Sequence, residues 1–379
     1  MAQTWPVSRR RMAALKFVDF IGRAVTSPFR RRRSKRGQQI ERILVIEPWN
    51  IGDVVLATPL LAELRRLFPT SRIALLGRAY ARDLLKGSGL VDEVIVVDLP
   101  WTAQKQKYRI TPAIAKELRK LVQQLRTKRF DVTLDARMDI RSNLLSAATG
   151  APRRIGYGIG GGGWLLTDTL PSNRDASHKI DDWLALLSLV ADSDRSMIAK
   201  RIPPRLVVDS EERQDARAAL TTTAGAGRPT IGYHPGGSHP GKRWPEDRFR
   251  ELMTELRSSI GGSHVVFLGP DEKGVAQWPA GVGVMRPSLR ELMAQISCCD
   301  VLICNDSGPM HIADALGVPV VAIFEIGNPE WFGPSGLQSK VVRGEFAGTG
   351  LSAAPLDRPP PNPVSVSRVA EAVKETLRT

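Results

Sequence analysis

The segment "DVLICNDSGPMHIADALG", residues 300–317, contains a strand, a turn and a helix in succession. The apolar run "VLIC" is typical of a buried strand. Pro309 favours the first turn of a helix, so the residues after it are expected to be helical. Asp306, Ser307 and Gly308 therefore lie where a strand ends and a helix begins. The free N–H groups and the dipole of a helix N-terminus attract phosphate, which makes this turn a candidate phosphate site.

Two interpretations of this turn compete. In the first, Asp306 and Ser307 only cap the helix, and His311 is a buried packing residue. In the second, Ser307 adds a hydroxyl to the phosphate site, and His311 points toward the same anion one turn later. A cap alone does not explain Gly308 and His311 together, so the pattern favours the phosphate site.

The same alternation of strand and helix runs through most of the chain. One series opens at Arg42 and a second opens near Thr230. The pattern predicts an α/β protein with two Rossmann-like, doubly wound domains, each a parallel sheet with helices on both faces. In such sheets ligands bind at the carboxyl ends of the strands. Strands are expected at 42–48, 72–78, 91–98, 131–136, 230–236, 264–270, 300–306 and 318–325.

Amphipathic periodicity predicts the helices between these strands. The first is expected at residues 58–69, with Thr58 as N-cap and Pro59 in its first position. In the C-terminal helix, apolar residues at helical spacing fit core packing. The other helices are expected at 112–130, 179–192, 245–259, 288–299, 309–317 and 366–378.

The composition divides the chain into four parts. We expect a basic amphipathic arm at 1–40, an N-terminal Rossmann-like domain at 41–195, a C-terminal Rossmann-like domain at 225–350, and a Pro-rich segment with a final helix at 351–379. The apolar content of 42% and the charged content of 25% are those of a globular protein. No apolar run reaches the ~18 residues that a transmembrane helix needs.

The cysteine pattern indicates the cellular compartment. Cys298, Cys299 and Cys304 lie in apolar sequence without the spacing of a metal site. This pattern favours buried, reduced thiols and a cytoplasmic location. The sequence predicts no metal site and no cofactor.

The formal net charge of +15 comes mostly from the arm. Residues 1–42 hold twelve Lys and Arg against two acids, whereas the rest holds 42 basic and 37 acidic residues. Nucleic-acid binding expects a basic face on the folded domain, so this distribution argues against a nucleic-acid partner.

The basic arm has an apolar middle between two basic clusters. Residues 9–36 match a helix that lies on an anionic membrane surface, which predicts a peripheral position on the inner face of the cytoplasmic membrane. A signal peptide is disfavoured because Lys16, Asp19 and Arg23 interrupt the apolar core. A solvated, disordered tail is the other interpretation.

The loop "EPWNIGDVVLATP", residues 47–59, brings Asp53 to the end of the first strand. A carboxylate there can take a proton from a hydroxyl group. Alternatively, Asp53 only caps the following helix, a position in which Asp is favoured.

The loop "HPGGSHPGKRWPED", residues 234–247, resembles a phosphate cradle without being a P-loop. Gly237 and Ser238 allow backbone N–H groups to approach an anion, and Lys242 supplies a positive charge. His234 and Trp244 are equally well explained by packing beneath the loop.

The loop "LGPDEKG", residues 268–274, carries Asp271 and Glu272. Their carboxylates can accept hydrogen bonds from ribose hydroxyls or a base, so we expect a nucleoside site there, with an exposed acidic turn as the alternative. Two phosphate-binding loops on one domain and an acid on the other are the layout of a glycosyltransferase.

Three motifs in this order resemble glycosyltransferase family 9, the bacterial lipopolysaccharide heptosyltransferases. They are "ILVIEPWNIGDVVLATPLLAELRRLFP", "HPGGSHPGKRWPEDRF" and "CNDSGPMHIADALGVPVVAIF", and the resemblance runs from about Arg42 to Pro334.

The resemblance implies a GT-B fold, with two Rossmann-like domains and an active site in the cleft between them. It makes 41–195 the acceptor-side domain and 225–350 the nucleotide-sugar-binding domain. In GT-B enzymes a helix such as that at 366–378 often crosses back to the first domain, which is the alternative to core packing for this helix. It implies inverting transfer of heptose from ADP-heptose to the inner core of lipopolysaccharide, a lipid-linked glycan acceptor. In this family the acid of the "GD" motif is the presumed general base, which falls on Asp53. The donor phosphates are bound by the loop before "KRWP" and by the "DSG" turn with its His, which fall here on Ser238, Lys242, Asp306, Ser307, Gly308 and His311.

The chain departs from the family pattern in several places. Other members carry Ala or Thr where Gly237 stands, and many have a Cys-rich segment where this chain has "GEFAGTGLSAAPLDRPPPNPVS". These departures bear on the donor sugar and the acceptor, and they leave two alternatives open. One is a transferase of the same fold that uses another nucleotide sugar for a capsule or O-antigen glycan. The other is a catalytically silent nucleotide-sugar-binding protein.

Overall fold

The computed structural model describes residues 39–102, 111–170, 178–191, 202–269, 277–344 and 363–378. The basic arm at 9–36, the pair Asp271 and Glu272, and most of the Pro-rich segment lie outside the described residues. The chain forms two compact units, an N-terminal unit up to Ile202 and a C-terminal unit from Pro203. In the part of the chain that the structure describes, no helix has the length and apolar character needed to span a bilayer.

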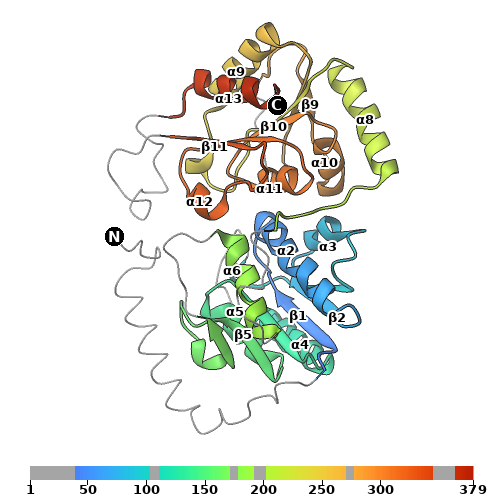
Figure 1. Cartoon of the computed structure of the whole chain (residues 1–379), viewed down its shortest axis with the longest axis vertical. Coiled ribbons are helices and arrows are strands. Elements are labelled where there is room, and N and C mark those ends of the chain that lie inside the picture. Colours follow the sequence, from blue (N-terminus) through green and yellow to red (C-terminus); the bar gives the residue numbers. More distant parts are fainter. Residues whose placement is uncertain are drawn as a thin grey trace. The chain divides into compact units, whose positions relative to one another are not determined.

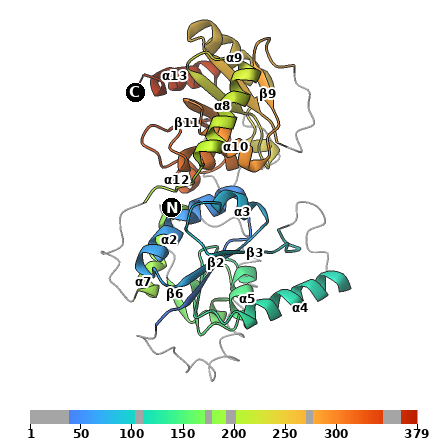
Figure 2. The same cartoon turned by 90° about the vertical axis from the view of Figure 1, so that its right-hand side faces the viewer.

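The N-terminal unit is built on a six-stranded parallel sheet with the strand order β3-β2-β1-β4-β5-β6. Helices flank this sheet (Figure 1 and Figure 2). Its elements are β1 (Arg42–Ile46), α2 (Ile51–Leu67), β2 (Arg72–Gly77), α3 (Tyr80–Leu85), β3 (Glu93–Val96), α4 (Pro112–Thr127), β4 (Val132–Asp135), α5 (Ile140–Ala148), β5 (Arg153–Tyr157), η2 (Gly163–Leu165), β6 (Asp168–Leu170), α6 (Lys179–Ala185) and α7 (Leu187–Val190).

The C-terminal unit repeats this architecture with the strand order β12-β11-β10-β7-β8-β9. Its elements are α8 (Ser210–Ala224), β7 (Thr230–His234), η4 (Pro240–Lys242), α9 (Glu246–Ser259), β8 (Ser263–Phe267), β9 (Gly283–Met285), α10 (Leu289–Ile296), β10 (Val301–Asn305), α11 (Gly308–Ala315), β11 (Val320–Phe324), α12 (Pro329–Phe332), β12 (Lys340–Arg343) and α13 (Val366–Thr376).

Both sheets therefore have the doubly wound order, in which the direction of strand addition reverses beside the first strand of the sheet. The reversal falls between β1 and β4 in the N-terminal unit and between β7 and β10 in the C-terminal unit. Within each unit, the loops that follow these two strands lie at a topological switch point, where doubly wound sheets bind ligands.

The start of α2 differs from the prediction. The helix begins at Ile51, with Asn50 as N-cap, so Thr58 and Pro59 lie inside it. The prediction was wrong because proline usually marks the first turn of a helix. Pro59 has no N–H to donate to the carbonyl oxygen of Val55, and the Thr58 hydroxyl donates to that oxygen instead, at 2.7 Å.

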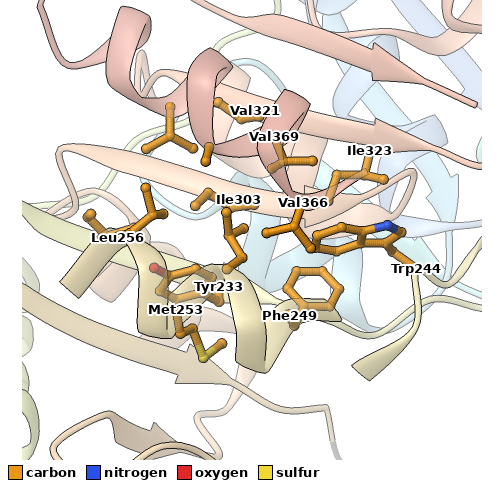
Figure 3. Close-up of a cluster of buried hydrophobic side chains, with 14 of the residues drawn as sticks. Tyr233, Trp244, Phe249, Met253, Leu256, Ile303, Val321, Ile323, Val366 and Val369 are labelled. Atoms are coloured by element: carbon orange, nitrogen blue, oxygen red, sulfur yellow. The ribbon is translucent and has the colours of Figure 1, made fainter. Parts of the chain in front are cut away.

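One face of the C-terminal sheet is covered by α9 and α13. Strand residues such as Tyr233 and Ile303 pack there against Phe249 of α9 and Val369 of α13 (Figure 3). Burial of these side chains stabilises the fold by about 25 cal/mol for each Å² of apolar surface removed from water. The C-terminal helix thus uses its apolar face to pack within the core of its own unit.

Candidate active site

In the C-terminal unit, β7 and β10 pair in parallel and bring two loops to one edge of the sheet. Cys304 of β10 lies opposite His234, the last residue of β7. The loop that carries Gly237, Ser238 and Lys242 follows β7, and the turn that carries Ser307 follows β10. The sequence placed these two loops after strands, and the parallel pairing brings them together.

Asn305 ties the long loop to the end of β10. Its side chain is fully buried. The Asn305 Nδ2 donates to the carbonyl oxygens of Pro235 at 2.6 Å and Gly236 at 3.1 Å, and its Oδ1 accepts from the backbone N–H of Trp244 at 3.0 Å. One amide therefore holds both ends of the loop. Sequence reasoning missed this residue, although an Asn at the end of a buried strand was a signal for it.

Lys242 is held by an ion pair with Asp306. The Lys242 Nζ lies 2.5 Å from Asp306 Oδ2, and the carboxylate side chain is only 7% exposed while the lysine side chain is 29% exposed. The short contact orients the ammonium group. Asp306 is negatively charged and repels phosphate, so this geometry suits it to position the lysine.

Ser307 and His234 lie side by side at the start of α11. The Ser307 Oγ is 3.5 Å from His234 Nδ1. Ser307 occupies the N-cap position, but its side chain makes no capping hydrogen bond to the helix. The interpretation of this serine as a simple cap is therefore not supported by its side-chain contacts. His311 lies one turn further on and is 5% exposed.

Gly237 and Ser238 lie on the outer part of the loop. The carbonyl oxygen of Gly237 accepts from Arg243 Nε at 2.8 Å. Ser238 is exposed. The C-terminal cluster thus consists of Lys242, Asp306, Ser307 and His234, with these two residues beside it in sequence.

In the N-terminal unit, Asp53 lies in the first turn of α2. Its Oδ2 accepts from the backbone N–H of Asn50 at 3.3 Å and from Asn50 Nδ2 at 3.2 Å. Asp53 thus takes part in the capping box of α2, in which Asn50 is the N-cap residue. The Asp53 Oδ1 makes an ion pair with Arg137 Nη1 at 2.8 Å, a contact that a cap does not require.

The environment of Asp53 keeps it ionised. Burial by itself would raise the pKa of this carboxyl group, but the charges of Arg137 and Lys179 and the hydrogen bonds from Asn50 hold the pKa below its usual value. Asp53 is therefore a carboxylate at neutral pH, the form that can accept a proton.

Two further acids lie at the same switch point. Glu47 follows β1 directly and is fully buried, and Asp135 ends β4 and is 1% exposed. Burial, followed by the charge of Asp53, raises the pKa of Glu47 to about 8. Burial raises the pKa of Asp135 to about 7, although its Oδ1 accepts from the backbone N–H of Arg137 at 2.8 Å. Sequence reasoning missed both acids, whose signal was a carboxylate at the end of an apolar strand.

Lys179 contributes a buried positive charge from the start of α6. Its Nζ donates to the carbonyl oxygen of Ala136 and lies 3.8 Å from Asp182 Oδ2. Burial lowers the pKa of this lysine, and the charge of Asp182 opposes that shift.

Trp49, in the loop after β1, contacts two arginines from other elements. The guanidinium carbons of Arg137 and Arg141 are 4.5 Å and 4.7 Å from its ring centroid. These are cation–π distances, which hold the planar side chains in place. The Tyr80 hydroxyl donates to the carbonyl oxygen of Trp49 and fixes the backbone of the same residue.

A glycine-rich segment supports the turn that carries Arg137. Gly160 has a φ of +88°, and a Cβ there would lie 1.9 Å from the carbonyl oxygen of Met138. The Asn143 Nδ2 donates to the carbonyl oxygen of Gly161 at 2.9 Å. The repeated glycines thus permit a close approach of two backbones.

The three cysteines are expected from the sequence to be buried, reduced thiols. All three cysteines are free. Cys299 and Cys304 are buried as predicted, whereas Cys298 is only partly buried. Within the described ranges, no group of three or more His, Cys, Asp and Glu side chains is arranged to hold a metal ion.

Two doubly wound parallel sheets, each with charged residues at its switch point, are the GT-B architecture of nucleotide-sugar glycosyltransferases. Solved structures share this fold. The Escherichia coli ADP-heptose LPS heptosyltransferase II matches 89% of this chain and 98% of its own, with a TM-score of 0.68 and 24% identity. A family 9 glycosyltransferase from Veillonella parvula matches 90% of this chain and 99% of its own, with a TM-score of 0.71 and 24% identity.

The family model for glycosyltransferase family 9 (heptosyltransferase) matches residues 118–349, more than half of the chain, and the chain belongs to this family. A curated relative, lipopolysaccharide heptosyltransferase 2 of Escherichia coli, is 26% identical over 318 residues, which are 80% of this chain and 88% of the relative. The predicted fold and family are thus confirmed.

Proposed function

We propose that the protein is an inverting glycosyltransferase that moves heptose from ADP-heptose to an inner-core acceptor of lipopolysaccharide. The relatives support this specificity, since they are named as heptosyltransferases of lipopolysaccharide and one is named for ADP-heptose. The observation that carries the proposal is the cluster of Lys242, Ser307 and His234 at the switch point of the C-terminal sheet.

The C-terminal cluster suits the diphosphate of the donor. The ammonium group of Lys242, the Ser307 hydroxyl and the N-terminus of α11 all favour an anion. The charge on the diphosphate increases as the bond to the sugar breaks, and preorganised donors stabilise that charge in the transition state. In this proposal Gly237, Ser238, Gly308 and His311 complete the phosphate site, and Asp306 orients Lys242.

The chemistry is a single displacement with Asp53 as the general base. The acceptor oxygen attacks the anomeric carbon while its proton passes to Asp53. The bond between the anomeric carbon and the phosphate oxygen breaks, and the nucleoside diphosphate leaves with the electron pair. Attack from the face opposite the leaving group inverts the anomeric configuration.

Membrane association belongs to the same proposal. The acceptor is a lipid, and the basic arm at 9–36 has the composition of a segment that binds anionic lipid. A peripheral position on the inner face of the cytoplasmic membrane would raise the local concentration of the acceptor. The proposed nucleoside contacts of Asp271 and Glu272 are inferred from their loop alone.

A donor panel with a base variant tests the proposal. The wild-type chain is assayed with ADP-heptose and with ADP- and UDP-hexoses on purified core acceptors, and ADP affinity is measured by calorimetry. Asp53→Asn is expected to lower kcat by at least about 10²-fold, the lower range for general-base catalysis, while ADP still binds. If Asp53→Asn turned over as fast as the wild type, Asp53 would not be the general base. Preference for a UDP-sugar would indicate a transferase that acts on another glycan.

A further inference from the structure

Glu47 is a buried acid that the proposed mechanism does not use. It is fully buried, and its Oε1 accepts from the backbone N–H of Trp49 at 3.3 Å. Its Oε2 has no hydrogen-bond partner among the described residues. A buried carboxylate with an unpaired oxygen is costly, whereas a neutral carboxylic acid at the same place is much less so.

Contacts connect Glu47 to Asp53 through Trp49 and Arg137. Glu47 fixes the backbone of Trp49, whose ring lies 4.5 Å from the guanidinium carbon of Arg137. The same guanidinium makes the 2.8 Å ion pair with Asp53. A change at Glu47 therefore reaches Asp53 through two intermediate side chains.

Charged and titratable groups face Glu47 from every element around it. Burial and the charge of Asp53 favour its neutral form and raise its pKa to about 8, while two cations oppose this shift. The charge of Asp135 favours the neutral form of Glu47 as well. Burial, followed by the charge of Glu47, raises the pKa of Tyr80. These groups are Asp53 of α2, Arg137 after β4, Lys179 of α6, Asp135 of β4 and Tyr80 of α3.

We propose that Glu47 is a positioning residue for Asp53, which as a neutral acid leaves the Arg137 guanidinium to Asp53 and whose ionisation stops sugar transfer. An ionised Glu47 would compete with Asp53 for Arg137 and place a second negative charge beside the base. This inference rests on the role of Asp53 in the proposed function. Beyond that function, it assigns control of the active site to the ionisation of Glu47, a residue that does not touch the substrate.

The pH dependence of kcat tests this role. In the wild type, kcat is expected to fall above pH 8 by about tenfold for each pH unit, as for one essential ionisation. Glu47→Gln keeps a neutral side chain with an oxygen for the Trp49 N–H, so its kcat is expected to stay level from pH 7 to 9. Glu47→Ala removes the oxygen and is expected to lower kcat at every pH.

Controls separate Glu47 from its neighbours. Glu117→Gln, an exposed acid of α4, is expected to keep the wild-type profile. A fall above pH 8 that persists in Glu47→Gln would assign the ionisation to Lys179 or Asp135 and overturn the inference. If Asp53→Asn were as active as the wild type, the proposed function would fail instead, so the two failures are distinguishable.

Infrared spectroscopy gives a readout that does not depend on turnover. The carbonyl stretch of a protonated carboxylic acid is expected at pH 6.5 in the wild type and should be lost on titration through pH 8. The difference between the wild type and Glu47→Gln isolates this band from that of Asp135. Identical spectra for the two proteins would overturn the inference.

Discussion

Replacement of Glu47 by Gln is expected to make stability less sensitive to alkaline pH. The pKa of Glu47 is about 8 in the folded chain and 4.5 in its unperturbed state. Between these values the folded chain keeps a proton that the unfolded chain has released, so rising pH favours unfolding. The stability contributed by the neutral acid is fully present below pH 4.5 and is lost as the pH rises through about 8.

The size of this effect follows from the shift. Each pH unit within the window corresponds to about 1.4 kcal/mol, so the window between the two pKa values corresponds to at most about 5 kcal/mol. Gln does not titrate, and it occupies nearly the same volume. The free energy of unfolding of Glu47→Gln relative to the wild type is therefore expected to rise between pH 5 and 8 and to level off above pH 8.

Urea denaturation of both proteins at pH 5, 6.5, 8 and 9 measures this difference. Other groups titrate over the same range, but they are common to the two proteins and cancel in the comparison. Glu117→Gln is the matched control, because that acid lies on the surface of α4. A difference between Glu47→Gln and the wild type that stays constant with pH would show that Glu47 is already charged in the folded chain, and the reasoning would be refuted.

Two further predictions concern Lys242 and Gly160. Lys242→Ala is expected to weaken ADP binding about 10- to 100-fold in calorimetry, which is the range for one charge-assisted contact. Arg243→Ala, at an exposed neighbouring residue, should change ADP binding little. Equal losses of affinity in the two variants would remove Lys242 from the diphosphate site. Gly160→Ala is expected to cost more than about 2 kcal/mol in urea denaturation, because its Cβ would collide with the Met138 carbonyl. Gly150→Ala, with φ +75° and open space around it, should cost only about 1–2 kcal/mol, and similar losses at the two glycines would contradict the proposed backbone contact.

Much of the fold could be read from local patterns. The eight expected strands are all present, because apolar runs of strand length between turn residues have few other solutions. Four strands were not anticipated. β5 and β12 are mixed in character, with Arg153 and Arg154 at the start of β5 and a charged residue at each end of β12, and β6 and β9 have only three residues each. The start of α2 was misplaced because propensity rules treat Pro59 as a boundary, although burial of most of the helix overrides them.

For the candidate site, too, some residues could be predicted from local sequence and others could not. Asp53, Lys242, Asp306 and Ser307 were found because each lies in the segment that follows a strand or in the first helical turn after it. The roles of Arg137 and Asn305 depend on contacts that cross many residues of sequence: Arg137 reaches Asp53 over 84 residues, and Asn305 reaches Trp244 over 61. No local pattern contains such a pairing.

The sequence by itself determined two doubly wound domains, the family, and the loops in which an acid and a phosphate site were to be sought, since periodicity and motif spacing are local properties of the chain. Only the tertiary structure decided which charges share a switch point. The pairing of β1 with β4 buries Glu47 near Asp53 and Arg137, and the pairing of β7 with β10 joins Lys242 to Asp306. The protonation of a buried acid depends on its distance from water and from other charges, and those distances are set by strand pairing.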